Sequence, residues 1–129
     1  MVDSDKKALK NDPRFIEALN LFNTGNWYQA HDALEELWHE SNGTLRQTLQ
    51  GFLQIAVAQL HLERGNHRGA TLLYGESLGR LGNPRAPDLG IDIEMLYYCV
   101  EKRLHLLQQE LDPDIVTVPL LLERESRTG

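Results

Sequence analysis

The sequence has little cysteine and no long apolar run. Its one cysteine, Cys99, excludes an intramolecular disulfide and a zinc site built on paired cysteines. No apolar run approaches the ~20 residues that a membrane helix needs, and the N-terminus lacks the apolar segment of a secretory signal. We therefore expect a cytoplasmic protein that makes no contact with a membrane.

Positive charge is scarce as well. The chain has 13 Lys and Arg residues against 19 Asp and Glu residues, which gives a net charge of −6 at pH 7. A nucleic-acid surface needs a clustered basic patch, and the local concentration at Arg64, His67 and Arg68 is too small. The sequence has no glycine-rich phosphate loop, nucleophile elbow or HExxH motif either. We expect no nucleic-acid partner, and the sequence leaves open whether the protein is an enzyme and whether it uses a cofactor.

Glycine, asparagine and proline residues divide the 129 residues into about five predicted helices, which form one compact all-α domain. Asp12 as a cap residue and Pro13 at the first helical position open the first of them. The helical core covers about residues 12–111, and residues 112–129 form a tail. The β-branched segment 115–119 predicts that this tail is extended along the surface.

One predicted helix, about residues 44–64, should lie at the centre of the bundle. Its residues 47–62 include no formal charge, which a helix on the surface of a soluble protein would need. The segment is also too short and too rich in glutamine to cross a membrane. We therefore expect the other helices to cover most of its sides.

The following helix contains three glycines, Gly69, Gly75 and Gly79. Each glycine costs helix stability, about 1 kcal/mol relative to alanine. Close approach of a neighbouring helix is the usual compensation, so we expect such contacts here. A homodimer formed through this helix is a further expectation.

Two segments forty residues apart repeat the same pattern. Gly25–Ala30 aligns with Gly65–Ala70, with glycine ending one helix and asparagine capping the next. In the first copy, Asn26 and Gln29 have the spacing of a capping box. The pattern predicts two helical hairpins that resemble tetratricopeptide hairpins, although two copies are too few for a free-standing solenoid.

Polar residues interrupt the apolar faces of two neighbouring helices. At 100° per residue, His31 falls within the apolar arc of its helix, and Glu35 lies at the edge of that arc one turn later. Gln50, Gln54 and His61 form one stripe of the next helix. If the helices pack on each other, these side chains meet inside the bundle. Each buried polar group that stays unpaired costs about 1–3 kcal/mol.

Two interpretations explain such a cluster. In the first, it is a small-ligand, catalytic or divalent-metal site, in which His31 is an acid–base group or ligand, Glu35 orients it and His61 lies opposite. Two histidines and one carboxylate suit zinc, manganese or iron, although the Glu-x-x-His pairs of di-iron bundles are absent. The predicted binding residues are Asp32, Trp38, Gln50 and Gln54. In the second interpretation, the protein is a non-catalytic interaction module, and the cluster is a structural hydrogen-bond network.

The same region resembles a known family. The residues G-N-W-Y-Q-A-H-D-A-L-E-E-L-W at 25–38 and Q-G-F-L-Q at 50–54 resemble the bacterial and archaeal domain of unknown function 309. The similarity extends from about Asn20 to about Leu111. It implies a small all-α bundle and no particular reaction. Carried over by position, the signature residues are His31, Asp32, Glu35, Trp38, Gln54, His61 and Gly65.

Asp32 is the exception among these signature residues, because the helical wheel places it on the solvated side. A salt bridge to a neighbouring helix or loop, such as the region of Arg68, is one interpretation of its presence.

Overall fold

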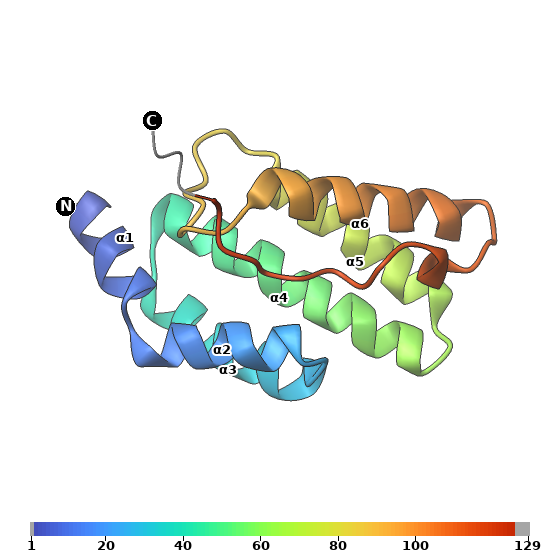
Figure 1. Ribbon diagram of the computed structural model, residues 1–129, viewed down its shortest axis with the longest axis horizontal. Helices are drawn as coiled ribbons and strands as arrows, with labels where there is room; N and C mark the ends of the chain where they lie inside the picture. Colours follow the sequence, from blue (N-terminus) through green and yellow to red (C-terminus); the bar gives the residue numbers. More distant parts are fainter. Residues whose placement is uncertain (1, 126–129) are drawn as a thin grey trace.

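The computed structural model describes residues 2–125, with side chains from residue 6 onward. The described residues form six α-helices and one short 3-10 helix (Figure 1). They are α1 (Val2–Lys10), α2 (Pro13–Asn23), α3 (Trp27–Glu40), α4 (Gly43–Glu63), α5 (His67–Leu81), α6 (Ile93–Gln108) and η1 (Pro113–Ile115). The all-α class is confirmed, and α1 is one helix more than expected. In the described part of the chain, no helix is long and apolar enough to cross a membrane.

Local signals determine where several helices begin. The Asp12 side chain accepts a hydrogen bond from the Arg14 backbone N–H at 2.8 Å, and Pro13 occupies the first turn of α2. Asn66 caps α5 in the same way through the Gly69 N–H at 2.9 Å. The capping box predicted at Asn26 is wrong, because this side chain donates to the Thr24 hydroxyl instead.

The predicted pair of hairpins is confirmed. Gly25 and Gly65 both have left-handed backbones, with φ of +78° and +73°. In both turns the asparagine after the glycine donates its backbone N–H to the carbonyl five residues earlier, at 2.9 Å for Asn26 and 2.8 Å for Asn66. Hairpins α2–α3 and α4–α5 therefore share one turn geometry, which glycine adopts without steric cost.

Helix α4 runs through the middle of the molecule (Figure 1). It contacts α3 on one side and α5 on the other, and α6 packs against α5. Phe52 and Ile55 of α4 are fully buried. The other helices do not fully cover one stripe of α4, however, and its residues Arg46, Gln50 and His61 are only half-buried. The prediction of a central helix holds, and this half-covered stripe is the side on which its polar residues lie.

The tail is part of the packed structure. It passes between α6 and α2, in front of α4 (Figure 1). Leu121 is buried, and the Asn23 side chain bonds both its N–H and its carbonyl, at 2.7 and 2.9 Å. The predicted extended backbone is present beyond η1. The expectation that residues 115–119 lie along the surface is confirmed, since only Pro119 among them is buried, and the buried Pro113 and Leu121 anchor the tail on either side.

The glycines of α5 differ in their surroundings. A Cβ at Gly69 would lie 2.9 Å from the His61 ring, so the predicted close approach exists there. A Cβ at Gly75 or Gly79 would have no heavy atom within 4 Å, so close approach is wrong for these two positions. Both glycines are exposed on the outside of α5.

We expect the double variant Gly75→Ala with Gly79→Ala to raise the free energy of unfolding by about 1–2 kcal/mol. Alanine restricts the unfolded chain and favours the helix, and both positions have room for a methyl group. Urea denaturation of both proteins measures the difference. Gly69→Ala is the matched control and should lower stability, because its methyl group collides with the His61 ring. A loss of stability in the double variant would contradict the prediction.

Candidate functional site

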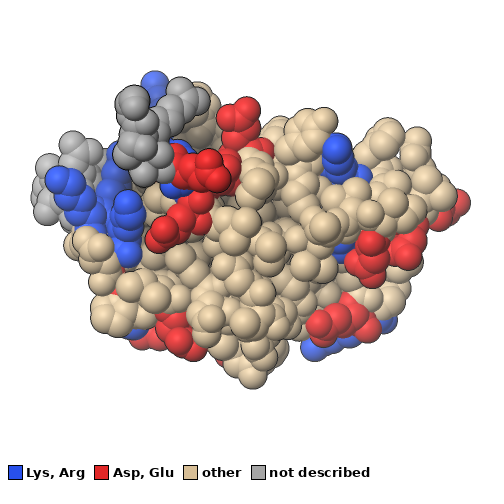
Figure 2. Space-filling model, viewed as in Figure 1, with Lys and Arg blue, Asp and Glu red and all other residues tan. Residues whose placement is uncertain are grey.

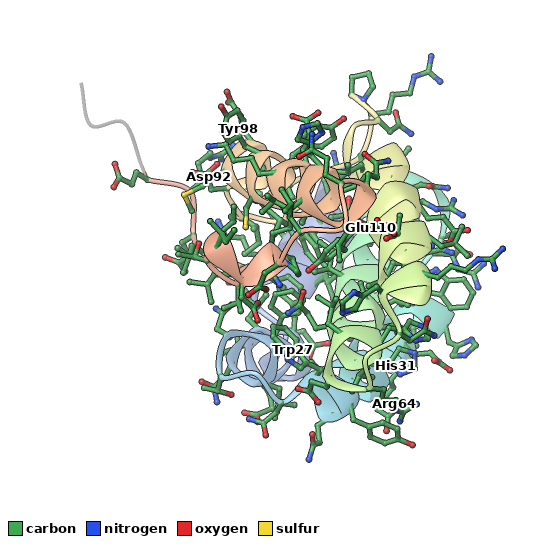
Figure 3. The ribbon with its side chains drawn as sticks, turned by 90° about the vertical axis from the view of Figure 1, so that its right-hand side faces the viewer. Trp27, His31, Arg64, Asp92, Tyr98 and Glu110 are labelled. Carbon is green, nitrogen blue, oxygen red and sulfur yellow. The ribbon has the colours of Figure 1, made fainter. Side chains whose placement is uncertain are left out.

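The half-covered stripe of α4, with the residues of α3 and α5 beside it, forms what we call the polar face. Contacts connect the three helices across it, from Trp38 to Arg46 and from Gln54 to Glu76. Figure 3 shows His31 on the outer side of α3, whereas Trp27 points into the bundle. The polar face comprises His31, Glu35, Trp38 and His39 of α3, Arg46, Gln47, Gln50, Gln54 and His61 of α4, and Glu76 and Arg80 of α5.

Glu35 lies between two histidines. One carboxylate oxygen is 3.1 Å from His31 Nε2 and the other is 3.5 Å from His39 Nε2. His31 Nδ1 is also 3.3 Å from the carboxylate of Asp32. The predicted pairing of His31 with Glu35 is confirmed. Asp32 contacts His31, so its predicted contact with the Arg68 region is corrected.

The expected inward orientation of this cluster is also corrected. The side chains of His31 and Glu35 are 25% and 44% exposed, so they border solvent. The helical wheel placed His31 within the apolar arc, but it does not show how far a neighbouring helix extends over that arc. The cluster is therefore accessible to a ligand from outside the bundle.

Trp38 and Arg46 form a stacked pair across α3 and α4. The guanidinium carbon is 3.6 Å from the centroid of the indole ring, within cation–π distance. Trp38 Nε1 and Arg46 Nε are both buried, and neither has a hydrogen-bond partner in the protein. Two donors are thus left without acceptors at this end of the polar face.

Gln54 leaves an acceptor without a donor. Its side chain is 6% exposed, and its amide nitrogen donates to Glu76 Oε2 at 3.1 Å. Its carbonyl oxygen Oε1 has no partner. Further along α4, Gln47 accepts a hydrogen bond from Arg80 at 2.9 Å. Within residues 2–125, neither Arg46 nor Arg80 forms an ion pair with a carboxylate.

His61 and Gln50 take different positions. The ring nitrogen Nδ1 of His61 is 3.1 Å from the amide of Asn66, which holds His61 at the α4–α5 turn. Gln50 is half-buried in the middle of the α4 stripe. In the described part of the chain, no three His, Cys, Asp or Glu side chains are grouped to hold a metal ion. The predicted metal set of His31, Glu35 and His61 is therefore not brought together.

Sequence reasoning missed Arg46, Gln47, Glu76 and Arg80 as members of this face. For Arg46 a signal exists, because it precedes Gln50 and Gln54 at the i, i+4, i+8 spacing of a single helical stripe. Gln47, Glu76 and Arg80 have no comparable signal. They meet only because α4 and α5 pack against each other.

Outside the polar face, sequence reasoning also missed Arg103. This residue of α6 is fully buried and bonds the carbonyls of the tail. Its Nε donates to the Tyr74 hydroxyl at 2.9 Å, and that hydroxyl donates to Gln59. Burial raises the pKa of Tyr74 to about 12, and the Arg103 charge opposes the rise. Burial also raises the pKa of Cys99, so its thiol is no activated nucleophile.

Comparisons with known proteins agree with the resemblance in the sequence. Residues 15–73 match domain of unknown function DUF309. A Bacillus subtilis protein named "Uncharacterized protein YpuF" is 39% identical over 72 residues, which is 54% of this chain and 41% of that relative. The chain thus spans less than half the length of this curated relative. The family match runs from α2 into α5 and stops before the predicted limit at Leu111. The resemblance is confirmed over residues 15–73, the stretch of the chain that matches the DUF309 family model.

Proposed function

We propose that the polar face binds a small amphoteric molecule, with its carboxylate at Arg46 and its ammonium group at Gln54 and Glu76. The observation that supports this most strongly is the buried Gln54 carbonyl oxygen without a partner. An unpaired buried acceptor costs about 1–3 kcal/mol. A bound ammonium group would supply the missing donor.

The opposite end of the polar face suits an anion. The Arg46 guanidinium has five donors in a planar arrangement that fits a carboxylate, and it pairs with no acidic residue in the described part of the chain. Stacking on Trp38 restricts the plane of the guanidinium. A carboxylate that binds Arg46 would therefore meet a preorganised partner.

The distance between these two ends limits the size of the ligand. Arg46 and Gln54 are eight residues apart on α4, about 12 Å along the helix axis. The Glu76 carboxylate beside Gln54 favours a positive group at that end. An extended chain with ammonium and carboxylate at opposite ends has the matching charges and an elongated shape.

His31 and Glu35 lie on the α3 side of the same face. An imidazole held by a carboxylate 3.1 Å away is suited to general acid–base catalysis. The catalytic roles of His31, Glu35 and His61 stay predictions, as do the binding roles of Asp32, Trp38 and Gln50.

The test uses 6-aminohexanoate, with hexanoate and hexylamine as matched probes that lack one charge each. In ¹⁵N-labelled protein, we expect 6-aminohexanoate to shift the Trp38 indole N–H signal until it saturates. The Trp27 indole, which is buried and lies eleven residues before Trp38 on α3, should not move. Arg46→Met should abolish the shift, and Arg85→Met, a change at an exposed loop arginine, should not. Equal shifts with all three probes, or with none, would count against the proposal.

A second prediction separates binding from structure at Gln54. We expect Gln54→Met to raise the free energy of unfolding by about 1 kcal/mol, because it removes the unpaired buried acceptor. The hydrogen bond to the exposed Glu76 is lost as well, and this loss offsets only part of the gain. The same variant should no longer bind 6-aminohexanoate. Chemical denaturation and the indole titration measure the two effects. The alternative function, an interaction module with a structural polar cluster, predicts the opposite result, a loss of stability.

A further inference from the structure

A second surface of the molecule is apolar and lies outside the family match. Of the nine large apolar side chains that are exposed in the described chain, six fall between residues 95 and 122, on α6, in the turn after it or in the tail. Figure 2 shows a broad uncharged area in the middle of this side of the molecule, with charged side chains mostly toward its margins. We call the α6–tail strip the set Met95, Tyr98, Ile115, Val116 and Val118. Exposed apolar area of this kind marks interaction surfaces.

The strip is hollowed along its length. One shallow hollow of about 490 Å³ lies beside Met95 and Cys99, and another of about 550 Å³ lies beside His105 and Ile115. Both are also lined by Tyr98, Lys102 and Val116, so they adjoin. Tyr98 is 58% exposed and stands between them, on the outer side of α6 (Figure 3).

The charges beside Tyr98 are arranged symmetrically. Glu94 precedes Tyr98 by four residues and Lys102 follows it by four residues. Both are exposed, and both line the first hollow with Tyr98. The Lys102 ammonium lies 4.4 Å from the Tyr98 ring centroid. If two α6 helices are antiparallel and centred on Tyr98, the acidic position of each helix therefore lies opposite the basic position of the other.

From this pattern we propose that the α6–tail strip binds a second copy of the chain, with the two α6 helices antiparallel and Tyr98 at the centre. A two-fold interface requires a surface that is complementary to itself. In this arrangement Glu94 of each copy faces Lys102 of the other, which makes two equivalent ion pairs around the apolar centre. An exposed tyrosine beside hollows is typical of the residues that dominate such interfaces.

Changing the charge at Glu94 or at Lys102 provides the test. In either single variant, position 94 of one copy repels position 102 of the other. When the two variants are mixed, these positions attract each other again. Sedimentation equilibrium of the full chain should show a dimer of the wild-type protein. Glu94→Lys should weaken it about tenfold or more, because each copy then opposes like charges, and Lys102→Glu should do the same. An equimolar mixture of the two variants should form a heterodimer with the wild-type affinity, since every pair is again attractive.

Glu17→Lys is the matched control, because it makes the same charge change at an exposed position on α2. It should leave the dimer unchanged, and circular dichroism should show the same helix content in all variants. A monomeric wild-type protein at high micromolar concentration would overturn the proposal. So would a dimer that is insensitive to the variants at Glu94 and Lys102, because its interface would then lie elsewhere, for example on the glycine face of α5.

Discussion

Replacing Arg103 with methionine should lower the free energy of unfolding by about 3 kcal/mol, the largest effect of a single substitution predicted here. The guanidinium is fully buried and donates to the carbonyls of Pro113 and Val116 at 3.1 and 2.7 Å. It also bonds Asp114 at 3.1 Å. Methionine replaces the aliphatic part of the side chain and cannot donate, so these acceptors lose their partner. Hydrogen bonds to a charged group contribute about 1.5–3 kcal/mol each, and removing a desolvated charge offsets part of the loss.

The contact with the carboxylate is the smaller part of this effect. The side chain of Asp114 is 72% exposed, so solvent screens its attraction to Arg103. Asp114→Asn should therefore change stability by less than about 1 kcal/mol. Arg124→Met, which removes an exposed ion pair with Asp88, is the matched control and should also have a small effect. Urea denaturation of the four proteins measures these differences. If Arg103→Met were no more destabilising than Arg124→Met, the tail would not depend on Arg103.

Replacing Tyr74 with phenylalanine should lower the free energy of unfolding by about 2 kcal/mol near neutral pH. The hydroxyl accepts from Arg103 Nε and donates to Gln59, and the side chain is fully buried. Phenylalanine keeps the ring packed but leaves both partners without this bond. Each unpaired buried group costs about 1–3 kcal/mol, and small movements of Gln59 recover part of it. Tyr28→Phe, at a 59% exposed side chain, should leave stability unchanged.

The stability difference between wild type and Tyr74→Phe should also depend on pH. The folded pKa of Tyr74 is raised by burial to about 12, and the ordinary value in an unfolded chain is about 10. Because the folded state favours the protonated phenol, this contribution is complete below pH 10 and is lost as pH rises toward 12. The shift of about two units corresponds to about 2–3 kcal/mol.

Wild type should therefore lose its advantage over Tyr74→Phe between about pH 10 and about pH 12, whereas Tyr28→Phe should follow wild type throughout. Denaturation at about pH 8 and about pH 11 is sufficient to compare the three proteins. The comparison between variants cancels the contribution of the groups that all three proteins share. A constant difference at both pH values would show that Tyr74 does not titrate with a raised pKa.

The two substitutions should not be additive. Arg103 and Tyr74 share a hydrogen bond, so the double variant should be more stable than the sum of the single effects implies. Tyr74 lies on α5, Arg103 on α6, and the acceptors lie in the tail. With Gln59 on α4, this network joins four segments, of which α4 and the start of α5 lie within the family match.

Local features of this sequence were sufficient to predict much of the secondary structure. Asp12 and Asn66 cap helices because their side chains reach backbone N–H groups two or three residues away. The turns at Gly25 and Gly65 follow from the freedom of glycine at positive φ. The pair of His31 and Glu35 was predictable for the same reason, since residues four apart on a helix are neighbours whatever surrounds it. Helix α1 was missed because its sequence, VDSDKKALK, is short and predominantly polar.

Contacts between distant residues depended on the tertiary structure. Periodicity showed that Gln50, Gln54 and His61 share a stripe of α4, but the packing of α3 and α5 decided that this stripe stays half-covered. The same packing brought Glu76 to Gln54. Nothing local to Arg103 marks it as buried, because its acceptors lie in the tail.

The helical class, most helix boundaries, the two hairpins and the pairing of His31 with Glu35 thus follow from the amino-acid sequence alone. Each of these depends on interactions within a few residues along the chain. The packing of the helices, in contrast, sets which polar residues share one face, that Arg103 anchors the tail and that the tail is packed. Asn23 and Leu121 show why, since their two hydrogen bonds join residues 98 positions apart. Such contacts form only after the helices between them have packed, because no local pattern specifies which distant backbone group a side chain will meet.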